Sequence, residues 1–216
     1  MDVSKIFDAL NDPQREAVGA PPGPMLVLAG AGSGKTRVLT YRIAYLVQAL
    51  EVSPYSILAV TFTNKAANEM RKRIEGFLGF SVRGMWIGTF HGLSHRILRD
   101  HHELAGLPKG FEILDSDDQY RVIRRALKEL NLDEGYWPPR QIQWFINSQK
   151  EEGRRAAQVQ DNGDSHQQTL IRVYTHYEET CQRLGLVDFA ELLLRTLELL
   201  EQASSLLENY QQRFQH

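Results

Sequence analysis

Eight consecutive residues have the composition of a loop that binds phosphate groups: Ala29, Gly30, Ala31, Gly32, Ser33, Gly34, Lys35 and Thr36. Glycines allow the backbone to turn tightly and to bring its N–H groups close to a phosphate. Lys35 supplies a mobile charge for the β- and γ-phosphates, and Thr36 offers a hydroxyl ligand to Mg²⁺. Ala29 stands where the usual pattern has glycine. We expect this P-loop to bind a nucleoside triphosphate with Mg²⁺; the alternative is a glycine-rich turn that binds nothing.

The segments on both sides of this loop are the ones that a P-loop needs. Met25–Leu28 is a short apolar run that predicts a buried strand. After the loop, apolar residues recur at helical spacing: Leu39, Ile43, Leu46, Val47 and Leu50. The runs Ile57–Val60 and Gly84–Gly88 predict two more strands, with a helical pattern between them. This alternation predicts an α/β fold, with crossover helices joining the strands of a parallel sheet.

Polar residues follow the second and third predicted strands, at Thr61–Lys65 and Thr89–His91. Ligands of parallel sheets bind at the carboxyl ends of the strands, so both segments are candidates for a binding site. Their polar groups suit phosphates, and the rings of Phe62 and Phe90 suit a stacked base. The alternative is that both rings are core residues beneath the loops, as most aromatic side chains are.

Gln14 lies upstream of the P-loop, in a segment that predicts a short helix. Asn11 or Asp12 can cap this helix, with Pro13 as its first residue. Gln14 is then in the first turn, where its amide could pair with the edge of an adenine, donor to acceptor and acceptor to donor. An ordinary exposed helical glutamine is the alternative, and the pattern alone favours it.

The second half of the chain predicts a separate all-helical unit. Apolar residues recur at helical spacing around residues 93–98, 120–130, 142–146 and 170–184. Ser116 and Gln119 have the spacing of a capping box, and Asp188 and Glu191 that of another helix start. Residues 153–168 are polar and predict a mobile loop. Cys181 falls on an apolar stripe and is interpreted as a core thiol.

Composition limits the function classes. The chain has 216 residues, is 42% hydrophobic and carries a formal net charge of −2, so any contact with nucleic acid must come from local patches. A single cysteine excludes an intrachain disulfide. We see no N-terminal apolar leader and no apolar run of about 18 residues. We therefore expect a cytoplasmic protein without membrane partners.

Together these segments resemble the N-terminal part of superfamily 1 DNA helicases of the UvrD/Rep/PcrA group. Residues 10–17 resemble the family's Q motif, 29–37 its motif I, 61–70 its motif Ia, and 88–92 the DNA-contacting motif that follows. The resemblance covers essentially the whole chain. It implies that residues 1–90 are the first segment of a RecA-like motor domain, 1A, and that residues 91–216 are the inserted helical subdomain 1B, ending as the chain returns to 1A.

The resemblance also implies a function and roles for residues. The full enzyme would be a bacterial ATP-dependent helicase that translocates 3′ to 5′ and acts with other proteins in nucleotide excision and mismatch repair. Its substrates would be single-stranded DNA and junctions between single and double strands. Lys35 and Thr36 would be catalytic, with Thr36 holding Mg²⁺ through the nucleotide. Gln14 would read adenine, residues 29–37 would bind ATP with Arg37 beside the base, and five residues would contact DNA: Phe62, Thr63, Asn64, Thr89 and His91.

The family places an Asp-Glu pair on a strand beyond the position of His216, and an arginine finger on a second RecA-like domain. We therefore interpret the chain as a fragment that does not turn over ATP alone, because phosphoryl transfer needs those groups. An incomplete sheet leaves an open edge, so we also expect the fragment to self-associate or to be only marginally stable. The competing hypotheses are a nucleotide- or DNA-binding module without turnover, and an unrelated P-loop phosphotransferase.

Overall fold

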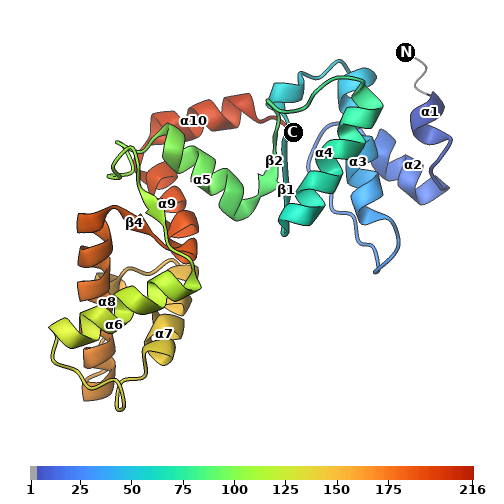
Figure 1. Ribbon diagram of the computed structural model, residues 1–216. Coiled ribbons are helices and arrows are strands. Elements are labelled where there is room, and N and C mark those ends of the chain that lie inside the picture. Colours follow the sequence, from blue (N-terminus) through green and yellow to red (C-terminus); the bar gives the residue numbers. More distant parts are fainter. Residues whose placement is uncertain (1–3) are drawn as a thin grey trace. The chain divides into compact units, whose positions relative to one another are not determined.

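The computed structural model describes residues 4–216 (Figure 1). The chain divides into two compact units. The first comprises residues up to Leu93 together with Ser205–His216, and the second, called the helical unit here, comprises Ser94–Ser204. The predicted division after residue 90 lies three residues from the first of these boundaries.

The first unit contains a pair of parallel strands covered by helices. Its elements are α1 (Ser4–Phe7), α2 (Asp12–Gly19), α3 (Lys35–Gln48), η1 (Pro54–Ser56), β1 (Leu58–Thr61), α4 (Asn64–Leu78), β2 (Trp86–Thr89), the start of α5 (Phe90–Asp100) and α10 (Ser204–Arg213). β1 and β2 are parallel and in register, from Leu58 beside Trp86 to Thr61 beside Thr89. The two later predicted strands and the parallel α/β architecture are thus confirmed.

The predicted strand at Met25–Leu28 is wrong, and the sheet has two strands instead of three. These residues form no strand, and the side chains of Leu26 and Leu28 are 82% and 86% exposed. A strand needs a ladder of hydrogen bonds to a neighbour. Among the described residues, β1 uses one edge for β2, and on its other side His216 pairs with the backbone of Ser56 and Leu58. Met25–Leu28 therefore has no strand to pair with.

The core of the first unit lies between the strands and helices α3 and α4. It is built from buried side chains of all four elements and of the loops beside them: Ile43, Leu46, Ile57, Ala59, Met70, Ile74, Leu78, Val82, Met85 and Ile87. Each large apolar side chain buried here stabilises the fold by about 1.5–3 kcal/mol. Leu39 of α3 and Leu50 beyond its end, predicted on the same stripe as Ile43, are 38% and 40% exposed. The buried face of α3 is therefore narrower than its sequence pattern.

Residues 205–216 pack with the first unit, whereas the predicted division placed them in the helical subdomain. The rings of Tyr210 and Phe214 lie 5.7 and 5.1 Å from the indole of Trp86, between centroids. His216 donates its backbone N–H to Ser56 and accepts from Leu58. Trp86 is fully buried by this cover. The chain thus returns to the first unit through α10, which covers the large ring of Trp86 on β2 (Figure 1).

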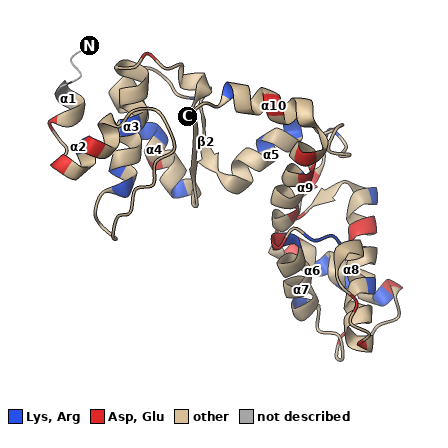
Figure 2. Cartoon of the chain, turned by 180° about the vertical axis from the view of Figure 1, so that it is seen from behind, with Lys and Arg blue, Asp and Glu red and all other residues tan. Residues whose placement is uncertain are grey.

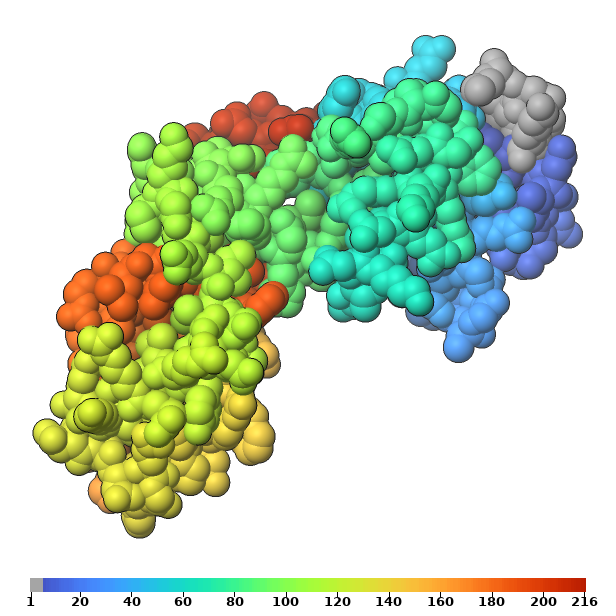
Figure 3. All heavy atoms as spheres, viewed as in Figure 1, coloured from blue at the N-terminus to red at the C-terminus, as the bar shows by residue number. Residues whose placement is uncertain are grey.

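The helical unit contains most of α5, then β3 (Glu112–Ile113), α6 (Ser116–Glu129), α7 (Pro139–Glu151), η2 (Ala156–Gln158), α8 (Ser165–Leu184), β4 (Leu186–Val187) and α9 (Phe189–Gln202). Its core includes Ile123, Leu127, Ile142, Ile146, Val173, Tyr174 and Tyr177. Figure 3 shows α6 covering the front face of this unit. The unit is not all-helical, because β3 and β4 form a short parallel pair. Two residues per strand are too few to produce a recognisable sequence pattern.

Two local expectations in this unit are also corrected. The N-cap of α6 is Asp115, whose carboxylate accepts from the N–H groups of Asp117 and Asp118, so Ser116 is the first helical residue. The polar segment at 153–168 contains η2 and is held in place, because Arg155 forms ion pairs with α8 and α9. Among the described residues, no helix is long and apolar enough to cross a membrane.

Candidate nucleotide and single-strand site

The P-loop is a tight turn that ends at the start of α3. Gly32 and Gly34 have φ values of 75° and 88°, which glycine adopts without strain. The turn is closed by Ser33, whose N–H and hydroxyl both donate to the carbonyl of Gly30, at 3.3 and 2.7 Å. Gly34 is the N-cap of α3, and Lys35 is its first residue. The glycines at 32 and 34 thus serve the loop's geometry as predicted.

The ammonium group of Lys35 is held over this loop. Its Nζ donates to the carbonyl oxygens of Ala29 and Gly30, at 2.9 and 2.8 Å. Lys35, Thr36 and Arg37 are all exposed. Because an ammonium has three donors, the two carbonyl contacts leave one for another acceptor. The lysine is therefore poised at the loop and can turn toward an anion by exchanging weak neutral acceptors for a charged one.

The space beside the loop suits a phosphate. A Cβ atom built on Gly30 or Gly32 would meet nothing within 4 Å, so the backbone there is open to a ligand. The first N–H groups of α3 have no partner within the helix and carry the positive end of its dipole. Residues 17–34 contain no charged side chain, as the tan loop in Figure 2 shows, so this segment itself contributes no carboxylate that would oppose an anion. These residues fit a nucleotide's phosphates.

Gln14 contacts the P-loop directly. Its Nε2 donates to the carbonyl of Ser33 at 3.0 Å, across 19 positions of sequence. Its backbone N–H donates to Asn11 Oδ1 at 3.0 Å, and its Oε1 accepts from the N–H of Asn11 at 3.2 Å. Asn11 is therefore the N-cap of α2, and Pro13 is its second residue, one position later than predicted. The structure thus places Gln14 against the P-loop and not on an unrelated helix surface.

Arg37 lies in the first turn of α3, beside a hollow between α3 and α4. The hollow has a volume of about 450 Å³ and is lined by Arg37, Tyr41, Arg73, Gly76 and Phe77. The guanidinium of Arg37 lies 5.4 Å from the centroid of the Tyr41 ring, and this ring packs edge-on against Phe77. A guanidinium over an aromatic face is a surface on which a flat base can rest.

The candidate DNA residues lie where β1 and β2 end. Thr63 caps α4 by accepting from the N–H of Ala66, and Thr89 accepts from the N–H of Gly92 at the start of α5, each at 3.1 Å. Thr89 is 8% exposed, so its hydroxyl has a structural task there. Asn64 is the exposed first residue of α4, and His91 lies half-buried in the first turn of α5.

Phe62 and Phe90 are exposed, so the interpretation of their rings as core residues is wrong. Phe62 is 89% exposed and Phe90 is 50% exposed. The sequence pattern could not predict the exposure of these rings, because a phenylalanine that follows a buried strand gives the same pattern whether its ring is buried or exposed.

Sequence reasoning missed a cluster of charged side chains in the helical unit. Lys150 Nζ lies 2.7 Å from Asp188 Oδ2 and 2.9 Å from Glu191 Oε2, and all three side chains are almost fully buried. Tyr177 donates its hydroxyl to Asp188 at 2.7 Å. One signal was available: Lys150 follows Ile142 and Ile146 at intervals of four, on the buried stripe of α7.

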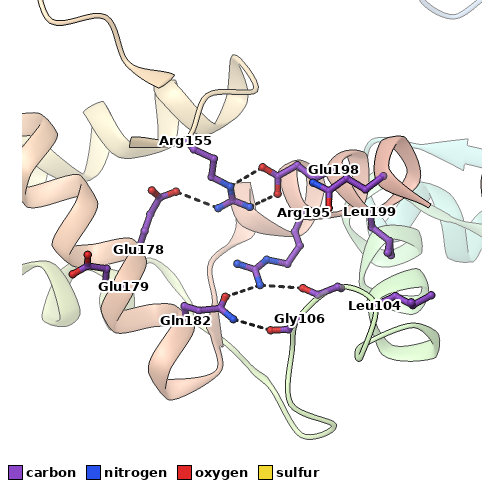
Figure 4. Close-up of a pocket in the computed structure, with 11 residues that line it drawn as sticks. Leu104, Gly106, Arg155, Glu178, Glu179, Gln182, Arg195, Glu198 and Leu199 are labelled. Atoms are coloured by element: carbon purple, nitrogen blue, oxygen red, sulfur yellow. Dashed lines mark hydrogen bonds and ion pairs between the residues drawn. The ribbon is translucent and has the colours of Figure 1, made fainter. Parts of the chain in front are cut away.

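Two arginines extend this buried-charge cluster to the surface (Figure 4). Arg155 pairs with Glu178, Glu191 and Glu198, and Arg195 pairs with Glu191 and Gln182. They line a pocket of about 440 Å³ beside Leu104, Gly106 and Leu199. The cations and carboxylates pair with one another, which makes the cluster a structural link between α7, α8 and α9.

The pKa values in this cluster follow from burial and pairing. Burial alone would raise the pKa of Glu191, but Lys150, Arg155 and Arg195 lower it well below its usual value. Burial would lower the pKa of Lys150, but Asp188 and Glu191 raise it overall. Burial raises the pKa of the Cys181 thiol to about 12, which agrees with a core thiol and excludes a reactive thiolate.

Known proteins resemble the chain over its whole length. It is 60% identical over 214 residues to DNA helicase II of Salmonella typhimurium and 59% identical over 214 residues to DNA helicase II of Escherichia coli. It is 45% identical over 220 residues to the ATP-dependent DNA helicase PcrA of Leuconostoc citreum. These matches cover 99–100% of the chain but only 29–30% of the relatives, so the chain spans less than a third of their length.

The chain also matches a family model, and this match agrees with the similarity to these relatives. Residues 10–216 match the model of the UvrD/REP helicase N-terminal domain. The matched range includes Gln14, the P-loop and both strand ends described above. The chain therefore belongs to the UvrD/REP helicase family, within the N-terminal domain of that family.

Proposed function

We propose that this chain is the nucleotide-binding and strand-binding part of an ATP-dependent DNA helicase that moves 3′ to 5′ and acts in excision and mismatch repair. The observation that carries the proposal is the meeting of Gln14 and Lys35 on one P-loop. In this proposal the first unit is part of motor domain 1A, and the helical unit is subdomain 1B. The polarity, the repair role and the repair partners are inferred from family membership alone.

The P-loop residues would hold the phosphates of ATP. Lys35 would exchange its contacts with the carbonyls of Ala29 and Gly30 for the β- and γ-phosphates, and the open backbone at Gly30 and Gly32 would surround them. Thr36 would hold Mg²⁺ together with the nucleotide. Mg²⁺ neutralises charge that develops on the transferred phosphoryl group.

The base of the nucleotide would lie near Gln14 and Arg37. The side-chain amide of Gln14 uses one donor for Ser33 and one lone pair for Asn11, so it keeps a second donor and a second acceptor for an adenine edge. Guanine carries an acceptor, O6, where adenine carries the N6 donor, so an amide fixed in this orientation discriminates against guanine. Arg37 would support the face of the base.

Single-stranded DNA would run across the carboxyl ends of β1 and β2. Phe62 offers an exposed ring to a base, while Asn64 and His91 offer polar groups at the starts of α4 and α5. Thr63 and Thr89 would contribute mainly by capping those helices, whose N-terminal N–H groups suit phosphates. Such contacts read no sequence, as a translocating enzyme requires.

Calorimetric titration of the 216-residue chain with ATP and GTP, each with Mg²⁺, tests the nucleotide site. Lys35→Ala removes one charge-assisted contact, which contributes roughly 1.5–3 kcal/mol. We therefore expect ATP to bind about 10- to 150-fold more weakly. Gln14→Ala should narrow the preference for ATP over GTP. Lys72→Ala, an exposed lysine on α4, is the matched control. Equal ATP affinity in the wild type and Lys35→Ala would contradict the proposal.

A further inference from the structure

Two phenylalanine rings meet at the carboxyl ends of the strands of the first unit. Thr61 of β1 lies beside Thr89 of β2, so the next residues, Phe62 and Phe90, leave the sheet at the same edge. Their ring centroids are 5.8 Å apart, and the ring planes are tilted by 47°. These values fall within the range of favourable contacts between aromatic rings.

The backbone that carries these rings is held on both sides. Phe62 lies between the last residue of β1 and Thr63, the N-cap of α4, whereas Phe90 follows β2 directly as the first residue of α5, whose first turn is closed by Thr89. The ring of Phe62 nevertheless remains 89% exposed, more than that of Phe90 at 50%. Exposed aromatic rings on a fixed backbone are typical of a binding surface.

Because the two rings are tilted relative to each other, they cannot play the same part in binding a base. A base stacks on a ring whose plane is nearly parallel to its own, so two rings tilted by 47° cannot both lie flat against one base. Phe62 is the more exposed ring and presents the open face. The ring of Phe90 contacts that of Phe62.

We propose that Phe90 is a positioning residue, which holds the Phe62 ring in the orientation that stacks on a base of single-stranded DNA. This inference rests on the proposed function, because it requires the strand to bind at this edge. Holding the ring in advance removes part of the entropy that the free side chain would lose on binding. Phe90 therefore acts on DNA through Phe62 and not by a contact of its own.

Fluorescence anisotropy with a labelled oligothymidylate tests this in the 216-residue chain. Phe62→Leu should weaken binding by about 5- to 150-fold, the range of one lost stacking contact. Phe90→Leu should weaken it by about 2- to 12-fold, the range of one aromatic pair. Phe90→Tyr keeps the ring and should bind normally. Phe80→Leu, at a ring that is 48% exposed beyond the end of α4, is the matched control and should change nothing.

The double variant Phe62→Leu/Phe90→Leu decides the role of Phe90. We expect it to bind no more weakly than Phe62→Leu alone, and losses that add would overturn the proposal. An oligonucleotide with the same phosphates but abasic sites should bind all variants alike, because only stacking is removed. Circular dichroism checks that each variant is folded.

Failure of the proposed function gives a different result. If Phe62→Leu binds the oligonucleotide as the wild type does, no base stacks at this edge, and both the strand site and the role of Phe90 are wrong. If the two leucine variants instead shift only the sedimentation of the chain, the rings form a contact between copies, which also overturns the proposal.

Discussion

Replacing Lys150 by methionine should destabilise the helical unit severely. Methionine has a similar length and no charge, so it fills the same space between α7, α8 and α9. The substitution leaves Asp188 and Glu191 buried without their shared ammonium, which lies 2.7 and 2.9 Å from their oxygens. Each side chain is less than 5% exposed, so water cannot replace the lost partner.

The expected loss is about 3–5 kcal/mol, the cost of removing one partner from a buried ion pair. Arg155 and Arg195 remain near Glu191 and reduce its share of the loss. Among the described residues, the remaining donors to Asp188 are neutral: the hydroxyl of Tyr177, the amide of Gln119 and the N–H of Glu191. A domain of this size has a total stability of about 5–15 kcal/mol, so the change removes a large part of it.

Amide hydrogen exchange read by mass spectrometry measures this change in each unit separately. Protection of peptides from α7 and α8 should fall by about 100- to 4,000-fold, which corresponds to 3–5 kcal/mol. Peptides from α3 and α4 in the first unit serve as the internal reference. Lys128→Met, at an exposed lysine in the last turn of α6, is the matched control and should cost under about 1 kcal/mol.

A compensating variant refines the test. Lys150→Met/Asp188→Asn removes the unpaired charge, and asparagine still caps α9 and accepts from Tyr177. It should therefore recover part of the protection that Lys150→Met loses. Unchanged protection of α7 and α8 in Lys150→Met would refute the reasoning, because the buried charges would then contribute nothing to stability.

Two further predictions concern the P-loop and acid. Gly34→Ala puts a Cβ 2.9 Å from Gln14 Nε2, at a backbone φ of 88°. It should lower the free energy of unfolding by about 1–2 kcal/mol in thermal unfolding and weaken ATP binding. Gly30→Ala is the control and should leave thermal unfolding unchanged, because its Cβ meets nothing within 4 Å. The pKa of Glu191 is lower in the folded than in the unfolded chain, so it stabilises above about pH 4.5 and this contribution is lost as pH falls. As the pH is lowered below about 4.5, the urea concentration at half unfolding should fall. This fall should be less steep in Glu191→Gln, which has no carboxylate to protonate at this position.

Local signals in the sequence determined much of the candidate nucleotide site. Glycines at positions 32 and 34, followed by Lys35, predicted the turn and the start of α3, because only nearby backbone angles and caps are involved. The apolar runs at 57–60 and 84–88 predicted β1 and β2 for the same reason. Asp188 was recognised as a helix cap, since capping depends on residues within one turn.

Only the tertiary structure decided which of these segments meet. Met25–Leu28 has the composition of a strand but no neighbour to complete its ladder among the described residues. Gln14 lies against Ser33 because α2 packs beside α3, which no local pattern reveals. The same holds for Phe62, whose exposure depends on how the strands and helices pack around it.

The buried charges also show which features the sequence predicts and which depend on the packing. The periodicity of α7 places Lys150 on the stripe of Ile142 and Ile146, but its partners come from positions 38 and 41 residues later. A charge can be buried only where opposite charges meet it, and that meeting depends on the packing of three helices. The sequence by itself determined most of the helices, the strands β1 and β2 and the turn of the P-loop. The packing decided which side chains face one another, because those contacts join residues far apart in the chain.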